Sequence, residues 1–324
     1  MTTGAGNGND IAVIGEAVAD AFVPATTGDD AARVGLTLRV RPGGGPANTA
    51  VALARLGTPT CFVGRRARGP FGDLLYAHLA ASGVDLSTSV SADEQATLAV
   101  AAVDRDGRAA YDFYATGTAD WQWTAAELNG RIPAGVGCVH TGSLALALHP
   151  AGPLIERALA AVRGRSVISI DPNVRTALVR PETYRAAINR WSRLADILRL
   201  SEEDLTQLAP GDSIETACSA WHDAGVALVV VTRGGRGAIA SLRGASVAVP
   251  ALDIDPVDTV GAGDAFTAGL LHRLWRHDLL RPGLPALTAD TLERAMTYAT
   301  QVAGRTCLVP GADPPWAADL SPDK

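Results

Sequence analysis

Ala227-Leu-Val-Val-Val-Thr232 is a short apolar run that leads directly into a glycine-rich segment. A continuous apolar run of this length, rich in β-branched residues, is typical of a strand that is buried on both faces. Runs of the same kind recur along the chain at Ile11–Gly15, Thr60–Gly64, Cys138–His140 and Val167–Ile170. The sequence therefore predicts a sheet that is covered on both sides.

Segments with helical periodicity separate these runs. We expect helices at Ala47–Leu56, Phe71–Ser82, Leu154–Val162, Pro181–Leu194, Ser213–Ala224, Ala265–Trp275 and Thr291–Ala303. Buried strands that alternate with helices form mostly parallel sheets, because each parallel connection must cross back over one face of the sheet. The predicted fold class is α/β, a sandwich that binds ligands at the carboxyl edge of its strands.

Two regions depart from this pattern. Arg33–Val40 alternates strictly between apolar and other residues, and Thr97–Val103 and Arg108–Tyr114 flank the turn sequence Asp104-Arg-Asp-Gly107. Strict alternation is typical of strands with one face in water, and the second pair reads as a hairpin. We expect a small second sheet that projects from the main domain, as a lid over a site, a surface extension or a dimer contact.

Composition excludes several classes of protein. The chain has 324 residues, of which 47% are hydrophobic and 19% charged, so it can bury a large core and is not disordered. Its net charge of −6 argues against nucleic acid as a partner, and it has no apolar run long enough to cross a membrane. The polar segment Met1–Asp10 lacks the features of a signal peptide.

The four cysteines are Cys61, Cys138, Cys218 and Cys307. No two of them form a CxxC pair, and we interpret them as buried thiols rather than as metal ligands or redox groups. We therefore expect a cytoplasmic protein.

The clearest chemical signal is Asp258-Thr-Val-Gly-Ala-Gly-Asp-Ala-Phe-Thr-Ala-Gly-Leu-Leu271. Gly261-Ala-Gly263 is a turn of small residues that runs into a predicted helix at Asp264. Successive backbone N–H groups at the start of a helix bind anions, and a carboxylate there can accept a proton from a hydroxyl group beside a phosphate. The alternative is that Asp264 only caps the helix.

A second signal is Arg41-Pro-Gly-Gly-Gly-Pro-Ala-Asn-Thr-Ala50 near the N-terminus. Its three glycines let the backbone approach a ligand closely, and Asn48 can both donate to and accept from sugar hydroxyls. The segment has neither the GxGxxG spacing of a dinucleotide site nor the Lys-Ser/Thr pair of a P-loop. A dehydrogenase is therefore disfavoured.

Together the two segments resemble the two signature regions of the ribokinase-like (PfkB-type) carbohydrate kinase family. The resemblance implies a three-layer α/β/α sandwich with a small β-sheet lid, which transfers the γ-phosphate of ATP to a hydroxymethyl group of a sugar. It implies one domain over residues 1–324, with a lid formed by about 16–42 and 96–118. Residues 1–9 and 315–324 are expected to be flexible tails.

The resemblance also implies roles for individual residues. Asp264 matches the general base of the family, and Gly261, Ala262 and Gly263 match its anion hole. The sugar-contacting positions fall on Asp20, Gly44, Gly45, Asn48 and Arg175. The nucleotide loop resembles Thr232-Arg-Gly-Gly-Arg-Gly237, which places Thr232, Gly234 and Gly237 along ATP.

For metals, the resemblance implies a water-mediated Mg²⁺ site at Asp204 and Glu203, and a monovalent cation, K⁺, near Asp258. The family's Asn-x-x-Glu motif appears here as Ser201-Glu-Glu-Asp204. Because aspartate is one methylene shorter than glutamate, its reach toward Mg²⁺ is reduced.

Asp171-Pro-Asn-Val-Arg175 looks like a segment of the fructokinase-like branch, and Gly45 stands where ribokinases have lysine. Fructose or a similar ketose is the expected substrate. A 2-keto-3-deoxygluconate kinase and a nucleoside kinase remain alternatives, the latter because Trp121 and Trp123 could stack on a base. A catalytically silent sugar- or nucleotide-binding regulator is the alternative outside enzymes. A homodimer through the lid strands is also expected.

Overall fold

The structure, a computed structural model, describes residues 11–23, 35–103, 109–243 and 245–320. Within these ranges the central sheet has eight strands in the order β14-β13-β12-β11-β10-β9-β1-β4. Their bounds are Ile11–Ile14 for β1, Thr60–Val63 for β4, Cys138–Gly142 for β9, Val167–Asp171 for β10, Ile197–Ser201 for β11, Leu228–Thr232 for β12, Ala238–Leu242 for β13 and Ala245–Val249 for β14. Neighbours from β4 to β12 are parallel, and β13 and β14 are antiparallel.

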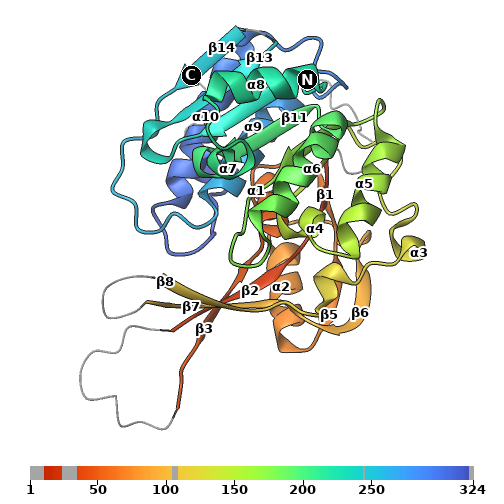
Figure 1. Cartoon of the computed structure of the whole chain (residues 1–324). Helices are drawn as coiled ribbons and strands as arrows, with labels where there is room; N and C mark the ends of the chain where they lie inside the picture. The colour runs from red at the N-terminus through yellow and green to blue at the C-terminus, as the bar shows by residue number, and fades with distance from the viewer. Residues whose placement is uncertain (1–10, 24–34, 104–108, 244, 321–324) are drawn as a thin grey trace.

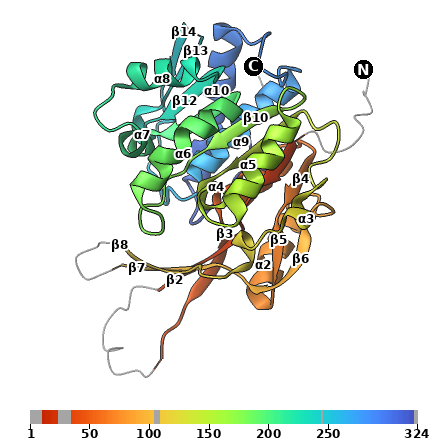
Figure 2. The ribbon, with the colours of Figure 1, turned by 45° about the vertical axis from the view of Figure 1, so that its right-hand side comes forward.

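Helices cover both faces of this sheet (Figures 1 and 2). One face carries α1 (Gly45–Arg55), α2 (Pro70–Ala81), α9 (Ala262–Arg276) and α10 (Ala289–Thr306). The other carries α3 (Ala125–Leu128), α4 (Ser143–Ala147), α5 (Ala151–Val162), α6 (Pro181–Leu194), α7 (Glu202–Leu208) and α8 (Ile214–Asp223). Strand β1 contributes Ile11 and Val13 to one core and Ala12 and Ile14 to the other, because successive side chains point to opposite faces. The predicted three-layer sandwich is confirmed.

A second sheet projects from the body of the molecule (Figure 1). Its order is β3-β2-β7-β8, with bounds Val18–Phe22 for β2, Arg39–Gly43 for β3, Leu98–Val103 for β7 and Ala109–Tyr114 for β8. Strands β7 and β8 form the predicted antiparallel hairpin, and its turn at 104–107 lies outside the described residues. This sheet is the expected lid sheet.

One lid strand differs from its predicted position. The sequence indicated Arg33–Val40, but β3 begins at Arg39 and ends at Gly43. Residues 35–38 are not in a strand, and Leu36 is 68% exposed; Val34 lies outside the described residues. Strand β3 pairs with β2 from Gly43↔Val18 to Arg39↔Phe22. Pairing with a neighbour, which alternation does not reveal, therefore sets the position of the strand.

A third, small sheet pairs β5 (Arg65–Arg68) in parallel with β6 (Val90–Gln95). In the sequence, Arg65, Arg66 and Arg68 form the densest basic cluster, which favours a solvated loop or a contact with an anionic substrate. Arg65 is instead buried, and its guanidinium lies 3.2 Å from Glu94 and 3.0 Å from Glu127. Buried charges require such partners, so Arg65 holds β5 to the neighbouring segments.

The end of the chain also differs from expectation over residues 315–320. A short 3-10 turn, η4 (Ala317–Asp319), follows Trp316, whose ring lies 5.1 Å from the Arg55 guanidinium. Leu320 is buried in a cluster with Leu56, Ala265 and Val302. These contacts hold the segment against α1, α9 and α10, so it is not a flexible tail; residues 1–9 and 321–324 lie outside the described ranges.

Two further expectations concern single residues. All four cysteines are buried and free, as predicted. Trp123 and Trp121, the last residue of the 3-10 turn η2 (Ala119–Trp121), are each 2% exposed and belong to the core beside α4 and α5. They pack the core and do not stack on a ligand. Among the helices that the structure describes, none is long and apolar enough to span a bilayer.

Candidate active site

Asp264 lies in the first turn of α9 and is 8% exposed. Its Oδ2 accepts a hydrogen bond of 2.8 Å from Asn48 Nδ2 on α1. Burial raises the pKa of Asp264 to about 7, and the bond from Asn48 opposes this shift. A carboxylate with a pKa near neutrality suits a general base, because it can both accept and release a proton at working pH.

The glycine-rich segment brings its backbone close to Asp264. A side chain at Gly45 would meet Asn173 Nδ2 at 2.8 Å, Asp264 Oδ1 at 3.3 Å and Ser143 Cβ at 3.8 Å. Gly44 precedes the helix α1 with φ of 97°, a conformation that favours glycine. Gly45, Asn48 and Asp264 therefore lie together, with Asn173 and Ser143 beside Gly45, whereas Gly44 packs on the backbone of residues 16–18.

Asp20 lies on β2 of the lid sheet, next to β3. Burial raises the pKa of Asp20 to about 6, and the positive charge of Arg175 opposes this shift. Arg175 follows β10, and its charge also lowers the pKa of Asp264. Both carboxylates thus lie within the electrostatic reach of Arg175, which joins the lid side and the base side of the candidate sugar site.

The predicted anion hole lies where the chain enters α9. Gly261 has φ of 77° and precedes the helix, and Ala262 and Gly263 are its first two residues. The first N–H groups of a helix have no acceptor within it, although Ala262 N–H donates to Thr259 O at 3.2 Å. A side chain at Gly263 would meet the Arg199 guanidinium nitrogens at 2.7 Å. The start of the helix therefore lies directly against a buried positive charge.

Sequence reasoning missed Arg199. It lies on β11, is 5% exposed, and bridges two neighbouring strands: Nη1 donates to Asp171 Oδ2 and Nη2 to Thr232 Oγ1, each at 2.6 Å. Asp171 ends β10 and Thr232 ends β12. The signal was a single arginine within the apolar run Ile197–Leu200, and it also kept that run from being recognised as a strand.

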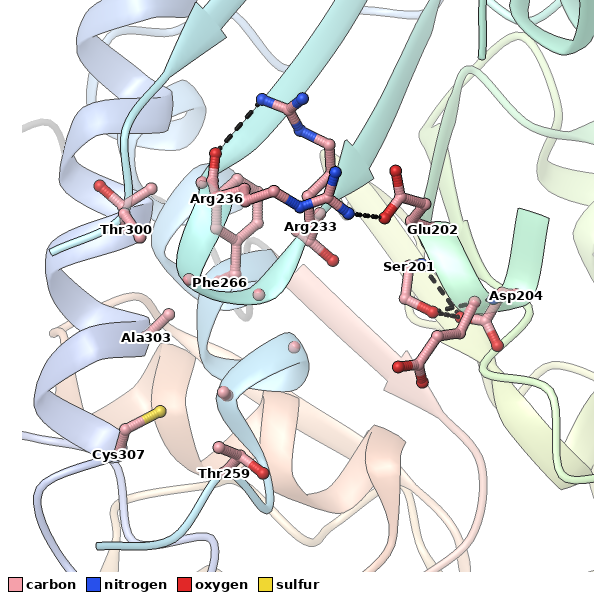
Figure 3. A pocket seen from close by; sticks show the side chains of 18 of the residues that line it. Ser201, Glu202, Asp204, Arg233, Arg236, Thr259, Phe266, Thr300, Ala303 and Cys307 are labelled. Carbon is pink, nitrogen blue, oxygen red and sulfur yellow. Dashed lines mark hydrogen bonds and ion pairs between the residues drawn. The ribbon is translucent and has the colours of Figure 1, made fainter. Parts of the chain in front are cut away.

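A cavity of about 740 Å³ adjoins this point. Its lining includes Gly263, Arg199 and the 3-10 turn η3 (Gly234–Arg236). Figure 3 shows two unlike walls. One wall carries Phe266 of α9, Thr300 and Ala303 of α10 and Cys307 just after it. The other carries Ser201 at the end of β11 and Glu202 and Asp204 of α7, and Glu203 also lines the cavity. Such a cavity can hold a flat apolar ring on one side and charged groups on the other.

The predicted nucleotide loop borders this cavity. Thr232, Gly234 and Gly237 all line it. Gly237 has φ of 83°, and a side chain there would overlap the Val249 carbonyl oxygen, so only glycine fits. Arg236 forms an ion pair with Glu202, and both residues line the cavity (Figure 3).

Asp204 is held by the protein itself. Its carboxylate accepts from Val174 N at 2.8 Å and from Ser201 N and Oγ at 3.0 and 2.7 Å. It therefore completes a capping box with Ser201 and fixes the segment after β10. Glu203 is exposed and lines the cavity. In the described part of the chain, no group of three or more side chains could hold a metal unaided.

Asp258 precedes the predicted anion hole in the sequence and does not line the cavity. Its Oδ1 accepts from Val260 N at 3.0 Å and its Oδ2 from Gly311 N at 2.7 Å. A side chain at Gly261 would meet Ala312 Cβ at 2.5 Å. Asp258 therefore ties the segment before α9 to the loop at 310–312.

Comparison with known proteins gives the class of this chain. Residues 9–319 match the pfkB family carbohydrate kinase. The chain belongs to this family, and it is a sugar phosphotransferase, as the resemblance of its two glycine-rich segments implied.

Two proteins show the relationship in detail. Fructokinase-1 of Oryza sativa subsp. japonica is 34% identical over 318 residues, covering 96% of this chain and 95% of the relative. A solved structure of the fructokinase from Vibrio cholerae O395 with fructose, ADP and calcium ion bound has a TM-score of 0.78 at 29% identity. A double mutant of that protein with fructose, ADP and potassium ion bound has a TM-score of 0.77, also at 29% identity. Each of the two structural matches covers 94% of this chain and 94% of the solved chain.

Proposed function

We propose that this chain transfers the γ-phosphate of ATP to a hydroxymethyl group of fructose or of a similar ketose. The observation that carries the proposal is Asp264, a buried carboxylate with a pKa of about 7 between the sugar-side amide of Asn48 and the start of α9. The fructokinases among its relatives, one of them with fructose and ADP bound, support the same substrates.

In the proposed reaction, Asp264 accepts the proton of the sugar hydroxymethyl group while the oxygen of that group attacks the γ-phosphorus of ATP. The bond from that phosphorus to the bridging oxygen of ADP breaks, and the proton passes from Asp264 to solvent. Backbone N–H groups of the segment Gly261–Gly263 stabilise the phosphoryl oxygens. Asn48 and Asp20 orient the sugar hydroxyls in this scheme, because the charge of Arg175 reaches both Asp20 and Asp264, the partner of Asn48.

Arg199 adds a fixed charge to this scheme. Its guanidinium lies against Gly263 and stays protonated at any working pH. Negative charge that develops on the transferred group next to Gly263 is therefore met by a positive charge that is already in place. Arg175, on the exposed side, can meet charge on substrate or phosphate oxygens.

ATP would occupy the 740 Å³ cavity along Thr232, Gly234 and Gly237, with its base against Phe266 and Ala303. Mg²⁺ commonly keeps several waters and binds through one or two carboxylates together with substrate phosphates. The exposed carboxylate of Glu203 fits that role, with Asp204 acting through water, and the ion would neutralise phosphate charge. For K⁺, Asp258 is the candidate residue, because it joins the two segments behind the anion hole.

We also propose a homodimer through the lid sheet. Strand β8 follows β7 in the order of this sheet, and Tyr114 on it is 61% exposed. Sedimentation velocity tests this: a single monomeric species at micromolar concentration would refute it.

A coupled assay of ADP release tests the function. Purified protein is supplied with ATP and Mg²⁺, with or without K⁺, and with fructose, 2-keto-3-deoxygluconate, ribose or adenosine. We expect fructose to give the highest kcat/KM. A preference for another acceptor would move the assignment to that substrate, and ATP-independent binding without turnover would indicate a silent regulator.

A further inference from the structure

Arg41 connects the lid sheet to the loop behind the anion hole. It lies on β3, and its Nη1 donates a hydrogen bond to the carbonyl oxygen of Pro310. The side chain also covers Gly311: a Cβ added there would meet Arg41 Nη1 at 2.9 Å and Cδ at 3.0 Å. Gly311 has φ of 81°, so the loop turns under the arginine where only glycine is unstrained.

The loop at 310–312 in turn supports the start of α9. Gly311 N–H donates to Asp258 Oδ2 at 2.7 Å, and Asp258 Oδ1 accepts from Val260 N–H. Ala312 packs so closely on Gly261 that no side chain would fit there. Gly261 directly precedes α9, so a shift of this loop moves the backbone that presents the anion-binding N–H groups.

At its other end, Arg41 belongs to the strand that borders the sugar site. In the β2–β3 pairing Arg41 lies opposite Asp20, and β3 continues through Gly43 and Gly44 into α1, which carries Asn48. A sugar that contacts Asp20 and Asn48 therefore binds to the two elements that adjoin β3. Arg41 of the same strand contacts Pro310.

We propose that Arg41 is a positioning residue that couples sugar binding at the lid to the geometry of the anion hole through residues 310–312. This rests on the proposed function for its ligands. Sugar bound against Asp20 favours the position of β3 in which Arg41 reaches Pro310, and that contact holds Gly261 in place for the phosphoryl group. A ligand shifts such an equilibrium only by its differential affinity for the two states, so the coupling is measurable and reciprocal.

The test compares Arg41→Met with Arg39→Met. Arg39 lies two residues earlier on β3, is exposed, and loses the same charge. Calorimetry gives the dissociation constant of ADP with and without saturating fructose. Typical coupling changes affinity by about 5- to 150-fold. We expect fructose to tighten ADP binding to the wild type and the Arg39→Met variant within this range. In Arg41→Met the ratio should fall toward 1, with the affinity for ADP alone changed less than about twofold, and Arg41→Lys should restore part of it.

Hydrogen exchange of the free protein provides a readout that needs no ligand. We expect faster amide exchange at residues 260–263 and at Val309, Gly311 and Ala312 in Arg41→Met than in Arg39→Met. Equal exchange in the two variants, or a wild-type fructose effect on ADP in Arg41→Met, would overturn the proposal. If the wild type fails to phosphorylate fructose, the proposed function fails, whereas the exchange experiment still decides the role of Arg41.

Discussion

The sugar side and the nucleotide side of the site each contain a buried aspartate, and the two aspartates have different partners. On the sugar side, Asp264 faces the neutral amide of Asn48, and burial raises its pKa to about 7. On the nucleotide side, Asp171 forms a buried ion pair with Arg199 at 2.6 Å. A carboxylate whose pKa lies near 7 can exchange a proton at working pH, whereas the carboxylate of Asp171 is occupied as the ion-pair partner of Arg199. Both aspartates are buried, so burial alone does not distinguish them; they differ in the group that their carboxylates face.

These two environments meet within one turn of helix. Gly263 lies against the Arg199 guanidinium, and the next residue, Asp264, points to Asn48. The phosphoryl group would therefore pass between a fixed positive charge and a carboxylate that can accept a proton. Changes to either side test whether this division of roles is real.

The largest expected effect comes from Asp264→Asn. The amide keeps a hydrogen-bonding group beside Asn48 but cannot accept the proton, and general bases contribute about 10²- to 10⁴-fold to rate. We expect kcat to fall by that order while ADP affinity stays within about twofold. The control is Asp73→Asn, because Asp73 also lies in the first turn of a helix but is exposed and distant in the fold. Near-wild-type turnover of Asp264→Asn would refute the role of the base.

Arg199→Met removes the buried ion pair on the nucleotide side. It leaves Asp171 buried without its cation, and breaking a buried pair in this way typically costs about 3–5 kcal/mol of stability. We expect a correspondingly lower free energy of unfolding in urea, together with reduced turnover. The double variant Arg199→Met/Asp171→Asn should recover most of the stability but not the turnover. Recovery of both would show that Arg199 has only a structural role.

Glu16→Gln tests the sugar side through stability. Glu16 is buried where the chain leaves β1 for the lid; its Oε2 accepts from Ala145 N, and burial raises its pKa from 4.5 to about 7. The folded state thus binds this proton more tightly than the unfolded state, and the stability it contributes below about pH 4.5 is lost as pH rises through 7. We expect the decrease in unfolding free energy between pH 5 and 8 to be smaller in the variant, by about 1–3 kcal/mol. An unchanged pH dependence would contradict this.

The pH–rate profile tests the sugar side without changing any residue. Because Asp264 must be ionised to act, kcat/KM should rise about tenfold per pH unit below its pKa and level off above about pH 7. Initial rates with fructose from pH 5 to 9 measure this. A profile that is flat from pH 5 to 7 would mean that the carboxylate is ionised throughout and that its pKa is not raised.

Much of the fold could be predicted because it depends on local patterns. Short apolar runs marked five strands of the central sheet, and helical periodicity marked α6 at its observed bounds, Pro181–Leu194. The predictions failed where a partner distant in the sequence decides the outcome. Strand β11 was not predicted, because the charged Arg199 interrupts its apolar run. Asp171 on the neighbouring strand β10 compensates that charge. Residues 315–320 were predicted to be a tail, but Trp316 and Leu320 pack against α1, α9 and α10.

By itself, then, the sequence determined the α/β class, the two glycine-rich segments and the candidate base, because turns and helix starts depend on residues that are close along the chain. Only the tertiary structure decided that Asn48 is the partner of Asp264, that Arg199 lies beneath Gly263, and that Arg41 reaches the loop at 310–312. In each of these contacts, the two residues are 64 to 269 positions apart in the sequence. Their distances, and the pKa that follows from them, arise only when the strands and helices pack together.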